Sequence, residues 1–253
     1  MAARPPAPGA RPKMRLLSYN IHKGIGGLDR RYDLERVIQV IDHERPDLIC
    51  LQEVTRHARR TGRDDQPAIL AARFGMPTHV FQMNVHYREG GYGNLILSRW
   101  PVVSSYHLCL RWGRWKPRGA QIVILDTPDG PLHLANWHLG LRQRERHWQV
   151  GKLLSHPPFL EGSTLPTMIV GDFNDWNSRL AAAALAENGF EEATRPTSRY
   201  RTFPAYLAVL AVDKAFYRGD VRVEDVRVVR TPLAKRASDH LPLVIDFRLP
   251  PRG

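Results

Sequence analysis

The chain has 253 residues, of which 43% are hydrophobic and 25% charged, so a fully disordered or collagen-like chain is excluded. Its 37 lysine and arginine residues outnumber 25 acidic residues and give a formal net charge of +12. This balance favours an anionic partner, which could be nucleic acid, an acidic membrane surface or a phosphorylated small molecule. A solvated basic surface is the alternative, because net charge reports solubility and association rather than chemistry.

The two chain ends and the cysteines indicate the limits of the domain and the cellular compartment. Residues 1–13 are basic, rich in proline and alanine, and lack the apolar stretch of a signal peptide, so we expect a disordered tail. No run approaches 18 apolar residues, so no transmembrane helix is expected. We expect a cytoplasmic monomer with one domain at 14–249 and a short tail at 250–253. Cys50 and Cys109 form no CxxC pattern and are expected to be buried apolar fillers.

The hydrophobic pattern predicts alternating strands and helices. In chain order, it predicts a strand at 14–21, a helix that Asp33 caps and that ends before Pro46, a strand at 48–52 and a helix at 65–74. A β-rich middle follows, with strands at 80–85, 93–98, 102–110, 120–126 and 132–137. Then come a helix at 142–154, a strand at 167–171, a helix at 178–188, and strands at 212–217, 221–229 and 243–248. So many strands with few helices indicate two packed sheets with helices outside.

Acidic, amide and histidine side chains gather where the predicted strands end. They are Asn20, His22, Glu53, His138, Asp172 and Asn174, with Asp239 and His240 just before the last strand. Strand ends that meet at one sheet edge hold side chains rigidly, and loops there admit a ligand. Each residue alone also has a plain structural explanation, such as a helix cap or a turn. Together, carboxylates and amides indicate a hard cation such as Mg²⁺, and in a basic protein they suggest phosphate ester chemistry.

Six short motifs run in order across nearly the whole chain. They are 18–22 (SYNIH), 51–53 (LQE), 93–94 (GN) with 97–99 (LSR), 136–139 (NWHL), 171–174 (GDFN) and 238–240 (SDH). Together they resemble the motifs of the endonuclease/exonuclease/phosphatase superfamily, whose fold is DNase I-like. Longer stretches at 20–24, 138–141, 171–176 and 202–204 resemble a bacterial branch of it that is often encoded beside cardiolipin synthase.

The resemblance implies an α/β fold, a four-layered sandwich of two packed, mainly antiparallel sheets flanked by helices. It also implies dependence on Mg²⁺ or Mn²⁺ and hydrolysis of a phosphodiester or phosphomonoester. Residue by residue, Glu53 would ligate the metal, with Asn20 beside it and Asp239 near enough to help.

The resemblance also implies the catalytic residues. His240 would be the catalytic histidine, oriented by Asp213, which is the base-plus-orienter arrangement that fixes a tautomer. Asp172 and Asn174 would position the attacking water and the phosphate, and His138 would hydrogen-bond a phosphate oxygen. Whether Asp172 or His240 takes the water proton stays open.

The resemblance also implies residues that contact the substrate or support those that do. The segment 87–89 resembles the stretch of pancreatic-type DNases that supplies a carboxylate partner for the histidine, so Glu89 is predicted to pair with His138. Arg118 lies where such nucleases place a phosphate-contacting arginine. Tyr87 and Asn94 are also predicted to bind substrate.

The segment 111–118 interleaves four cations with two tryptophans, which suits a phosphate backbone and stacked bases. Trp112, Arg114, Trp115 and Lys116 are therefore predicted to bind substrate, and the first interpretation is a Mg²⁺-dependent nuclease acting on DNA or RNA. A solvated hairpin is the plain alternative. Tryptophan with basic residues also suits a membrane surface, so a phosphatase or phosphodiesterase of phospholipid headgroups or inositol phosphates stays open. A non-catalytic binding module is disfavoured, because every motif residue is present.

Overall fold

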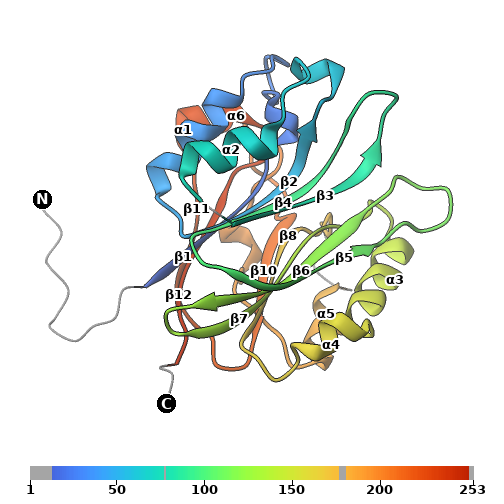
Figure 1. The fold of residues 1–253 in the computed structure, drawn as a ribbon, viewed down its shortest axis with the longest axis vertical. Helices are drawn as coiled ribbons and strands as arrows, with labels where there is room; N and C mark the ends of the chain where they lie inside the picture. The colour runs from blue at the N-terminus through green and yellow to red at the C-terminus, as the bar shows by residue number, and fades with distance from the viewer. Residues whose placement is uncertain (1–12, 77, 177–180, 251–253) are drawn as a thin grey trace, which may run out of the picture.

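The computed structural model describes residues 13–76, 78–176 and 181–250. The first of two sheets contains β1 (Met14–Asn20), β2 (Leu48–Arg56), β3 (Thr78–His86), β4 (Gly91–Ser98), β11 (Arg222–Val228) and β12 (Leu243–Arg248). Its six strands lie in the order β11-β12-β1-β2-β4-β3 (Figure 1). β1 and β2 are parallel, and the other neighbours are antiparallel.

The second sheet contains β5 (Val102–Cys109), β6 (Gly119–Thr127), β7 (Gly130–His138), β8 (Thr167–Asp172), β9 (Glu191–Glu192) and β10 (Asp213–Arg218). Its order is β5-β6-β7-β8-β10-β9, with β7 and β8 as the parallel pair. Each sheet is therefore mainly antiparallel, as predicted, but its parallel pair lies next to the functional residues.

Helices cover the outer face of each sheet (Figure 1). The first sheet carries α1 (Leu34–Glu44), α2 (Gln66–Phe74) and α6 (Pro232–Ala237), and the second carries α3 (Gln143–Leu154), α4 (Pro157–Glu161) and α5 (Ala181–Glu187). The predicted four-layered α/β sandwich is confirmed. No described helix is long and apolar enough to cross a membrane.

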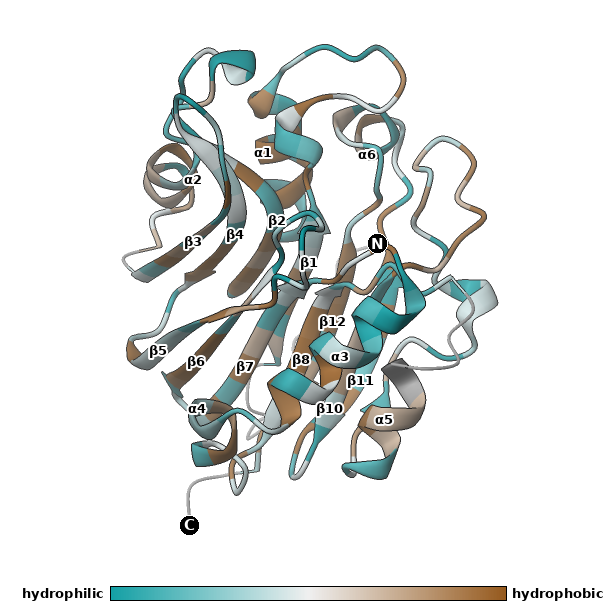
Figure 2. Cartoon of the chain, turned by 90° about the vertical axis from the view of Figure 1, so that its right-hand side faces the viewer, coloured by the Kyte–Doolittle hydropathy of each residue, from teal (hydrophilic) through white to brown (hydrophobic). Residues whose placement is uncertain are grey.

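The core lies in three layers, because each sheet buries both of its faces. Leu16, Leu134 and Val170 belong to the layer between the sheets, while separate clusters pack beneath the two groups of helices. Figure 2 shows this pattern as hydrophobic residues along the strands and polar residues on the outer helix faces. Cys50 is buried between the sheets as predicted. The same expectation is wrong for Cys109, which is exposed because it ends the edge strand β5.

Most predicted elements occur within a few residues of their expected bounds. α1 begins after Asp33, whose side chain accepts a hydrogen bond from the Arg36 backbone amide at 3.4 Å. The short elements α4, α6 and β9 were not predicted. The tails were predicted at 1–13 and 250–253, and all of their residues except Lys13 and Pro250 lie outside the described residues, as does the start of the predicted helix at 178–188.

Candidate active site

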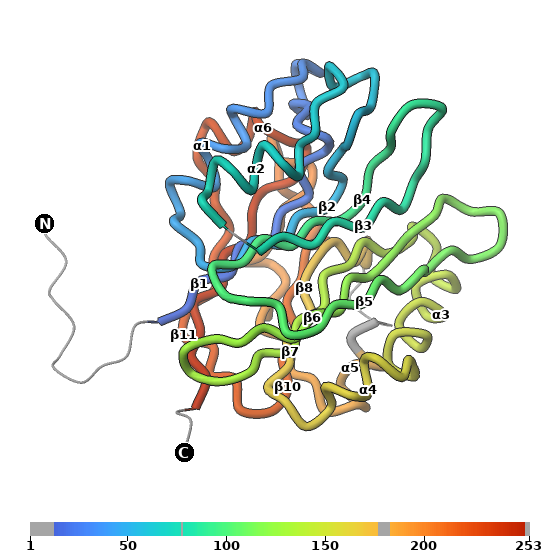
Figure 3. Tube along the Cα trace, in the orientation of Figure 1, coloured from blue at the N-terminus to red at the C-terminus, as the bar shows by residue number. Residues whose placement is uncertain are grey.

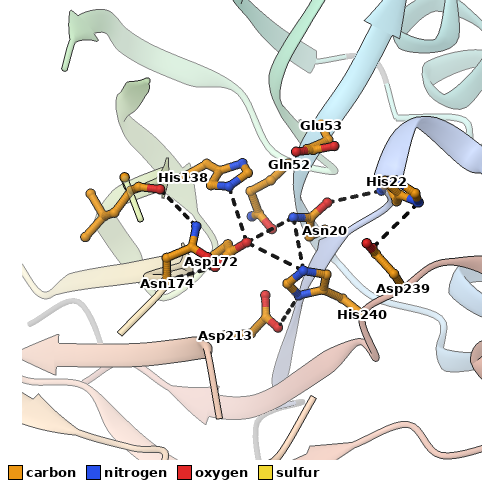
Figure 4. Close-up of polar contacts among 12 residues, drawn as sticks. Asn20, His22, Gln52, Glu53, His138, Asp172, Asn174, Asp213, Asp239 and His240 are labelled. Atoms are coloured by element: carbon orange, nitrogen blue, oxygen red, sulfur yellow. Dashed lines mark hydrogen bonds and ion pairs between the residues drawn. The ribbon is translucent and has the colours of Figure 1, made fainter. Parts of the chain in front are cut away.

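The two parallel strand pairs bring four predicted residues to one edge of the sandwich. Asn20 ends β1 and lies in register with Gln52, the residue before Glu53. His138 ends β7 and lies in register with Asp172 at the end of β8. Because parallel strands end at the same side of a sheet, the side chains of both pairs project into one site (Figure 4).

A β-bulge sets the position of Glu53. The register of β2 with β4 shifts between Leu51 and Val54, so two residues of β2 face one of β4. Glu53 has a φ of 57°, a value that is uncommon for a residue with a side chain. Bulges re-aim side chains next to functional sites, and here the strand continues to Arg56 instead of ending at the predicted Gln52.

Asp172 lies at the centre of the site (Figure 4). Its Oδ2 accepts a hydrogen bond from Asn20 Nδ2 at 3.0 Å and lies 3.3 Å from His138 Nε2 and 3.7 Å from His240 Nε2. Its Oδ1 accepts a hydrogen bond from the backbone amide of Asn174 at 2.9 Å. Side chains from both sheets therefore converge on one buried carboxylate.

Gly171 allows β8 to approach β7 directly before Asp172. Its φ is 136°, and a Cβ at this position would lie 2.1 Å from the Trp137 carbonyl oxygen. Only glycine combines this conformation with this close approach. The Trp137 ring is buried in the outer core, with its centroid 4.9 Å from that of Phe173.

His240 is held by the second sheet. Its Nδ1 lies 2.8 Å from Asp213 Oδ2, and Asp213 begins β10 in register with Asp172. The Phe203 ring packs against the imidazole with a centroid distance of 4.9 Å. The carboxylate favours a proton on Nδ1, and this leaves Nε2 to face Asp172.

The two histidines have opposite electrostatic environments. Burial lowers the pKa of His240, but Asp213 and Asp172 outweigh burial and raise that pKa to about 10. Burial, together with Arg118 and His240, lowers the pKa of His138 well below its ordinary value. Burial also raises the pKa of Asp172. At neutral pH the site therefore pairs a charged His240 with a neutral His138, a separation typical of acid–base machinery.

Cations surround Glu53. Burial raises the pKa of this carboxyl group, but Lys23, Lys116 and Arg118 overcome that effect and keep its pKa below the ordinary value. Lys23 Nζ forms a direct ion pair with Glu53. Lys116 Nζ lies 5.3 Å from the centre of the Tyr92 ring, over which Lys23 Nζ also lies, at 4.7 Å. The carboxylate is thus ionised and faces a cation in the structure.

The donor atoms near Glu53 fit a hard divalent cation. Asn20 lies between Glu53 and Asp239 in Figure 4, and all three offer oxygen atoms, which Mg²⁺ prefers. The ionised Glu53 already engages one cation, the Lys23 ammonium. Asp239 is 29% exposed and lies 3.8 Å from His22 Nδ1. These oxygen atoms could hold a metal ion without disrupting the contacts of Asp172 with the two histidines.

A second group could in principle ligate a metal. One ligand atom from each of Asp172, Asp213 and His240 lies within 4.8 Å of the others. However, His240 Nδ1 already bonds Asp213, and Asp172 is engaged by Asn20 and Asn174. We therefore interpret this group as acid–base machinery.

The predicted pair of Glu89 and His138 is wrong. Glu89 lies at the tip of the β3–β4 hairpin, where its side chain is 52% exposed and bonds Arg63 at 3.0 Å. The carboxylate beside His138 is Asp172, at 3.3 Å. The resemblance of the segment 87–89 to pancreatic-type DNases implied the pair with His138, but at the hairpin tip Glu89 is exposed and bonds Arg63 instead. Tyr87 is 47% exposed on the same tip.

Asn94 also differs from its predicted role. It is only 1% exposed, and its side-chain amide donates a hydrogen bond to the Gly119 carbonyl at 2.9 Å. This bond ties β4 of the first sheet to β6 of the second, so the structure gives Asn94 a place between the sheets. Arg118 is 6% exposed and lies close enough to influence Glu53.

The basic loop at 111–118 borders the site. The β5–β6 hairpin that carries it and the β3–β4 hairpin extend from the same side of the molecule (Figure 3). The Arg142 guanidinium lies 3.7 Å from the centre of the Trp115 ring and covers one ring face. Arg114 is exposed and Trp112 is half-buried.

A buried amide network that was not predicted from the sequence lies between the sheets. Gln52 Nε2 donates to Asn136 Oδ1 at 2.7 Å, and Asn136 Nδ2 donates to Gln121 Oε1 at 3.0 Å. All three side chains are fully buried. The signal was present, since each amide interrupts an apolar strand, and a buried polar group needs a partner. The network links β2 to β7 across the interior and holds the two strands at a fixed separation beside the site.

Comparison with known proteins identifies the family. The model of the Endonuclease/Exonuclease/phosphatase family matches residues 17–240. The chain belongs to this family. It is 27% identical over 246 residues to the uncharacterized protein YbhP of Escherichia coli strain K12, which covers 93% of this chain and 96% of YbhP. Its place in the branch encoded beside cardiolipin synthase stays a prediction.

Solved structures of endonuclease/exonuclease/phosphatase proteins share the fold. The protein of this family from Beutenbergia cavernae DSM 12333 has a TM-score of 0.78 and 24% identity, covering 95% of this chain and 72% of that one. The human Nocturnin catalytic domain with bound sulfate anion has a TM-score of 0.73 and 23% identity, covering 94% of each chain. The family fold supports a phosphoester hydrolase.

Proposed function

We propose that this protein is a divalent-metal-dependent phosphodiesterase that cleaves nucleic acid. The observation that carries the proposal is the convergence of Asn20, His138 and His240 on Asp172, with the ionised Glu53 at the neighbouring strand end. A metal bound by Glu53, Asn20 and Asp239 would polarise the phosphoryl oxygen and neutralise developing charge.

The residues of the chain divide the remaining work. Asp172 orients a water molecule and accepts its proton while the water oxygen bonds phosphorus. The bond from phosphorus to the leaving oxygen breaks, and that oxygen takes up a proton from solvent to leave as an alcohol. His240, oriented by Asp213, donates a hydrogen bond to the crowded anionic phosphate, and His138 and Asn174 offer further donors. Because the protein forms no covalent bond to the substrate in this scheme, most of the rate acceleration comes from positioning the water and the phosphate and from stabilising charge.

Nucleic acid is the substrate class that the surroundings of the site support best. Lys116 and Arg118 belong to the loop at 111–118 and are also among the cations that lower the pKa of Glu53. A nucleic-acid phosphate backbone bound along this loop would therefore lead into the site. The loop also offers Trp115 for stacking, since this side chain is 39% exposed although Arg142 covers one face of its ring. Cations with aromatic side chains are typical of single-strand binding.

A membrane-surface substrate is the second candidate, because exposed apolar side chains border the site near Asp239. Tyr206 is 54% and Leu207 is 63% exposed, in a loop whose Ala205 amide donates to the Asp239 carbonyl at 2.7 Å. Leu28 is 59% exposed and follows Gly27, which packs against Asp239. Such side chains next to cations suit a lipid interface.

A substrate panel separates the two candidates. Purified protein with Mg²⁺ would be assayed against single-stranded and duplex oligonucleotides, bis-p-nitrophenyl phosphate, p-nitrophenyl phosphate and vesicles of anionic phospholipid. We expect the oligonucleotides to be cleaved fastest, with Asp172→Asn as the inactive control. Release of headgroups from vesicles with intact oligonucleotides would favour the lipid candidate and overturn the nuclease.

A further inference from the structure

A cavity of about 320 Å³ opens next to the candidate active site. Its walls come from the segment at 55–61, which follows the bulge in β2, and from the β3–β4 hairpin tip at 87–89. Lys23 lines the cavity and also pairs with Glu53, so the cavity adjoins the candidate active site.

The cavity carries unneutralised positive charge. Arg59, Arg60 and Arg88 line it, and none of them has an ion-pair partner within the described part of the chain. Glu89 is the acidic residue of the lining, and Arg63 already neutralises it at 3.0 Å. Three arginine residues around one hollow form an environment suited to phosphate, which arginine binds in a bidentate manner.

An aromatic pair connects the cavity to the metal-binding side of the site. Tyr87 lines the cavity, and its ring centroid lies 5.7 Å from that of Tyr92. Lys23 Nζ lies over Tyr92 at 4.7 Å. Side-chain contacts therefore run without a break from Glu53 through Lys23 and Tyr92 to Tyr87. One group of a ligand could occupy the cavity while its scissile phosphate lies at the metal-binding residue Glu53.

We infer that this cavity binds a second phosphate of the substrate, next to the scissile one in an oligonucleotide. The inference rests on the proposed nuclease function and names a subsite for it. About 320 Å³ lies at the lower end of ligand pockets, which span roughly 300–1,000 Å³. The size suits one phosphorylated nucleotide better than a length of strand, so the cavity favours substrates with a phosphorylated nucleotide at this end.

Binding to metal-free protein tests the subsite without catalysis. Thymidine 3′,5′-bisphosphate and thymidine 5′-monophosphate would be titrated calorimetrically into wild type, Arg60→Gln/Arg88→Gln and the control Arg222→Gln, an exposed arginine at the start of β11. We expect the double variant to bind the bisphosphate about tenfold or more weakly and the monophosphate as wild type does. Unchanged bisphosphate affinity, an equal loss for both ligands, or no bisphosphate binding by wild type would overturn the inference.

Cleavage distinguishes this inference from the proposed function. Wild type is expected to cleave pTpT or TpTp with a higher kcat/KM than TpT, and the double variant to lose that preference about tenfold while TpT is unaffected. If wild type cleaves no oligonucleotide, the proposed function fails and bisphosphate binding still decides the subsite. If all three dinucleotides are cleaved equally, the function stands and the subsite is refuted.

Discussion

His240 Nδ1 lies 2.8 Å from Asp213 Oδ2, and the opposite ring nitrogen faces Asp172 at 3.7 Å. The imidazole thus lies between two buried carboxylates that come from neighbouring strands of the second sheet. Asp213 fixes the ring orientation, and Asp172 is the acceptor at which the other site residues meet. Because the two carboxylates contact opposite ring nitrogens, a substitution of either one measures its separate contribution to catalysis.

Asp213→Asn should lower kcat by about 10² to 10⁴, the usual contribution of acid–base groups. The amide keeps the shape but favours the wrong tautomer of His240. KM should change little, because Asp213 is buried beneath the histidine. Steady-state kinetics on a diester substrate measure both, and the exposed Asp220→Asn is the control. Wild-type kcat in Asp213→Asn would show that His240 needs no orienting partner.

Asn136→Leu should destabilise the fold by about 1–3 kcal/mol, because it leaves buried amides of Gln52 and Gln121 without their shared partner. Urea unfolding measures the free energy. Gln39→Ala, on the exposed face of α1, should cost about 0.5 kcal/mol or less. An equal free energy of unfolding in Asn136→Leu and wild type would mean that the amide network does not stabilise the packing of the two sheets.

His133 should make the fold sensitive to acid. Burial, helped by Arg218, lowers its pKa from 6.5 to about 4 in the folded state. As pH falls, His133 therefore takes up its proton in the unfolded chain before it does so in the folded protein. The free energy of unfolding that is present above pH 6.5 is then progressively lost toward pH 4. Relative to His133→Gln, wild type should lose up to about 3 kcal/mol over this window.

Unfolding free energies of both proteins at pH 7, 6, 5 and 4 test this linkage. The difference between them should narrow or reverse as the pH falls. Parallel pH curves for wild type and His133→Gln would show that His133 does not titrate on unfolding in this range.

Arg114→Ala tests the basic loop through salt. If its guanidinium contacts a phosphate, the slope of log affinity against log salt for a single-stranded oligonucleotide should flatten by about 0.7. Arg114 is preferable to Lys116 for this purpose, since Lys116 also acts on Glu53. Fluorescence anisotropy at several salt concentrations gives the slope, with Arg222→Gln as the control. A slope equal to that of wild type would remove Arg114 from the nucleic-acid contact.

The sequence predicted much of the fold because its strands have a clear pattern. The residues at the ends of β1, β7 and β8 could be predicted, since polar side chains follow apolar runs there and the six motifs occur in order. Asp213 lies beside Asp172 because β10 pairs with β8, and its side chain contacts His240 Nδ1 at 2.8 Å. The family resemblance implied the pair of His240 and Asp213, and the hydrophobic pattern alone did not.

Other features depend on three-dimensional detail that no local pattern contains. The extra residue in the bulge at Glu53 appears only in the register of β2 with β4. Glu89 was misplaced because the direction of a hairpin tip depends on the twist of the whole sheet. In sequence, Asn94 and Asn136 resemble ligand-binding amides. Only the packing of one sheet on the other shows that their side chains form hydrogen bonds across the interior.

The role of Glu53 in holding a divalent metal is the central claim, and Glu53→Gln tests it most directly. Mg²⁺ would be titrated into metal-free wild type and variant by calorimetry, and the same titration would be followed by diester hydrolysis, with EDTA as the reference. We predict that EDTA abolishes hydrolysis, that Mg²⁺ or Mn²⁺ restores it in wild type, and that Glu53→Gln remains folded but binds Mg²⁺ much more weakly. Full hydrolysis in EDTA, or equal Mg²⁺ affinity in the two proteins, would contradict this claim.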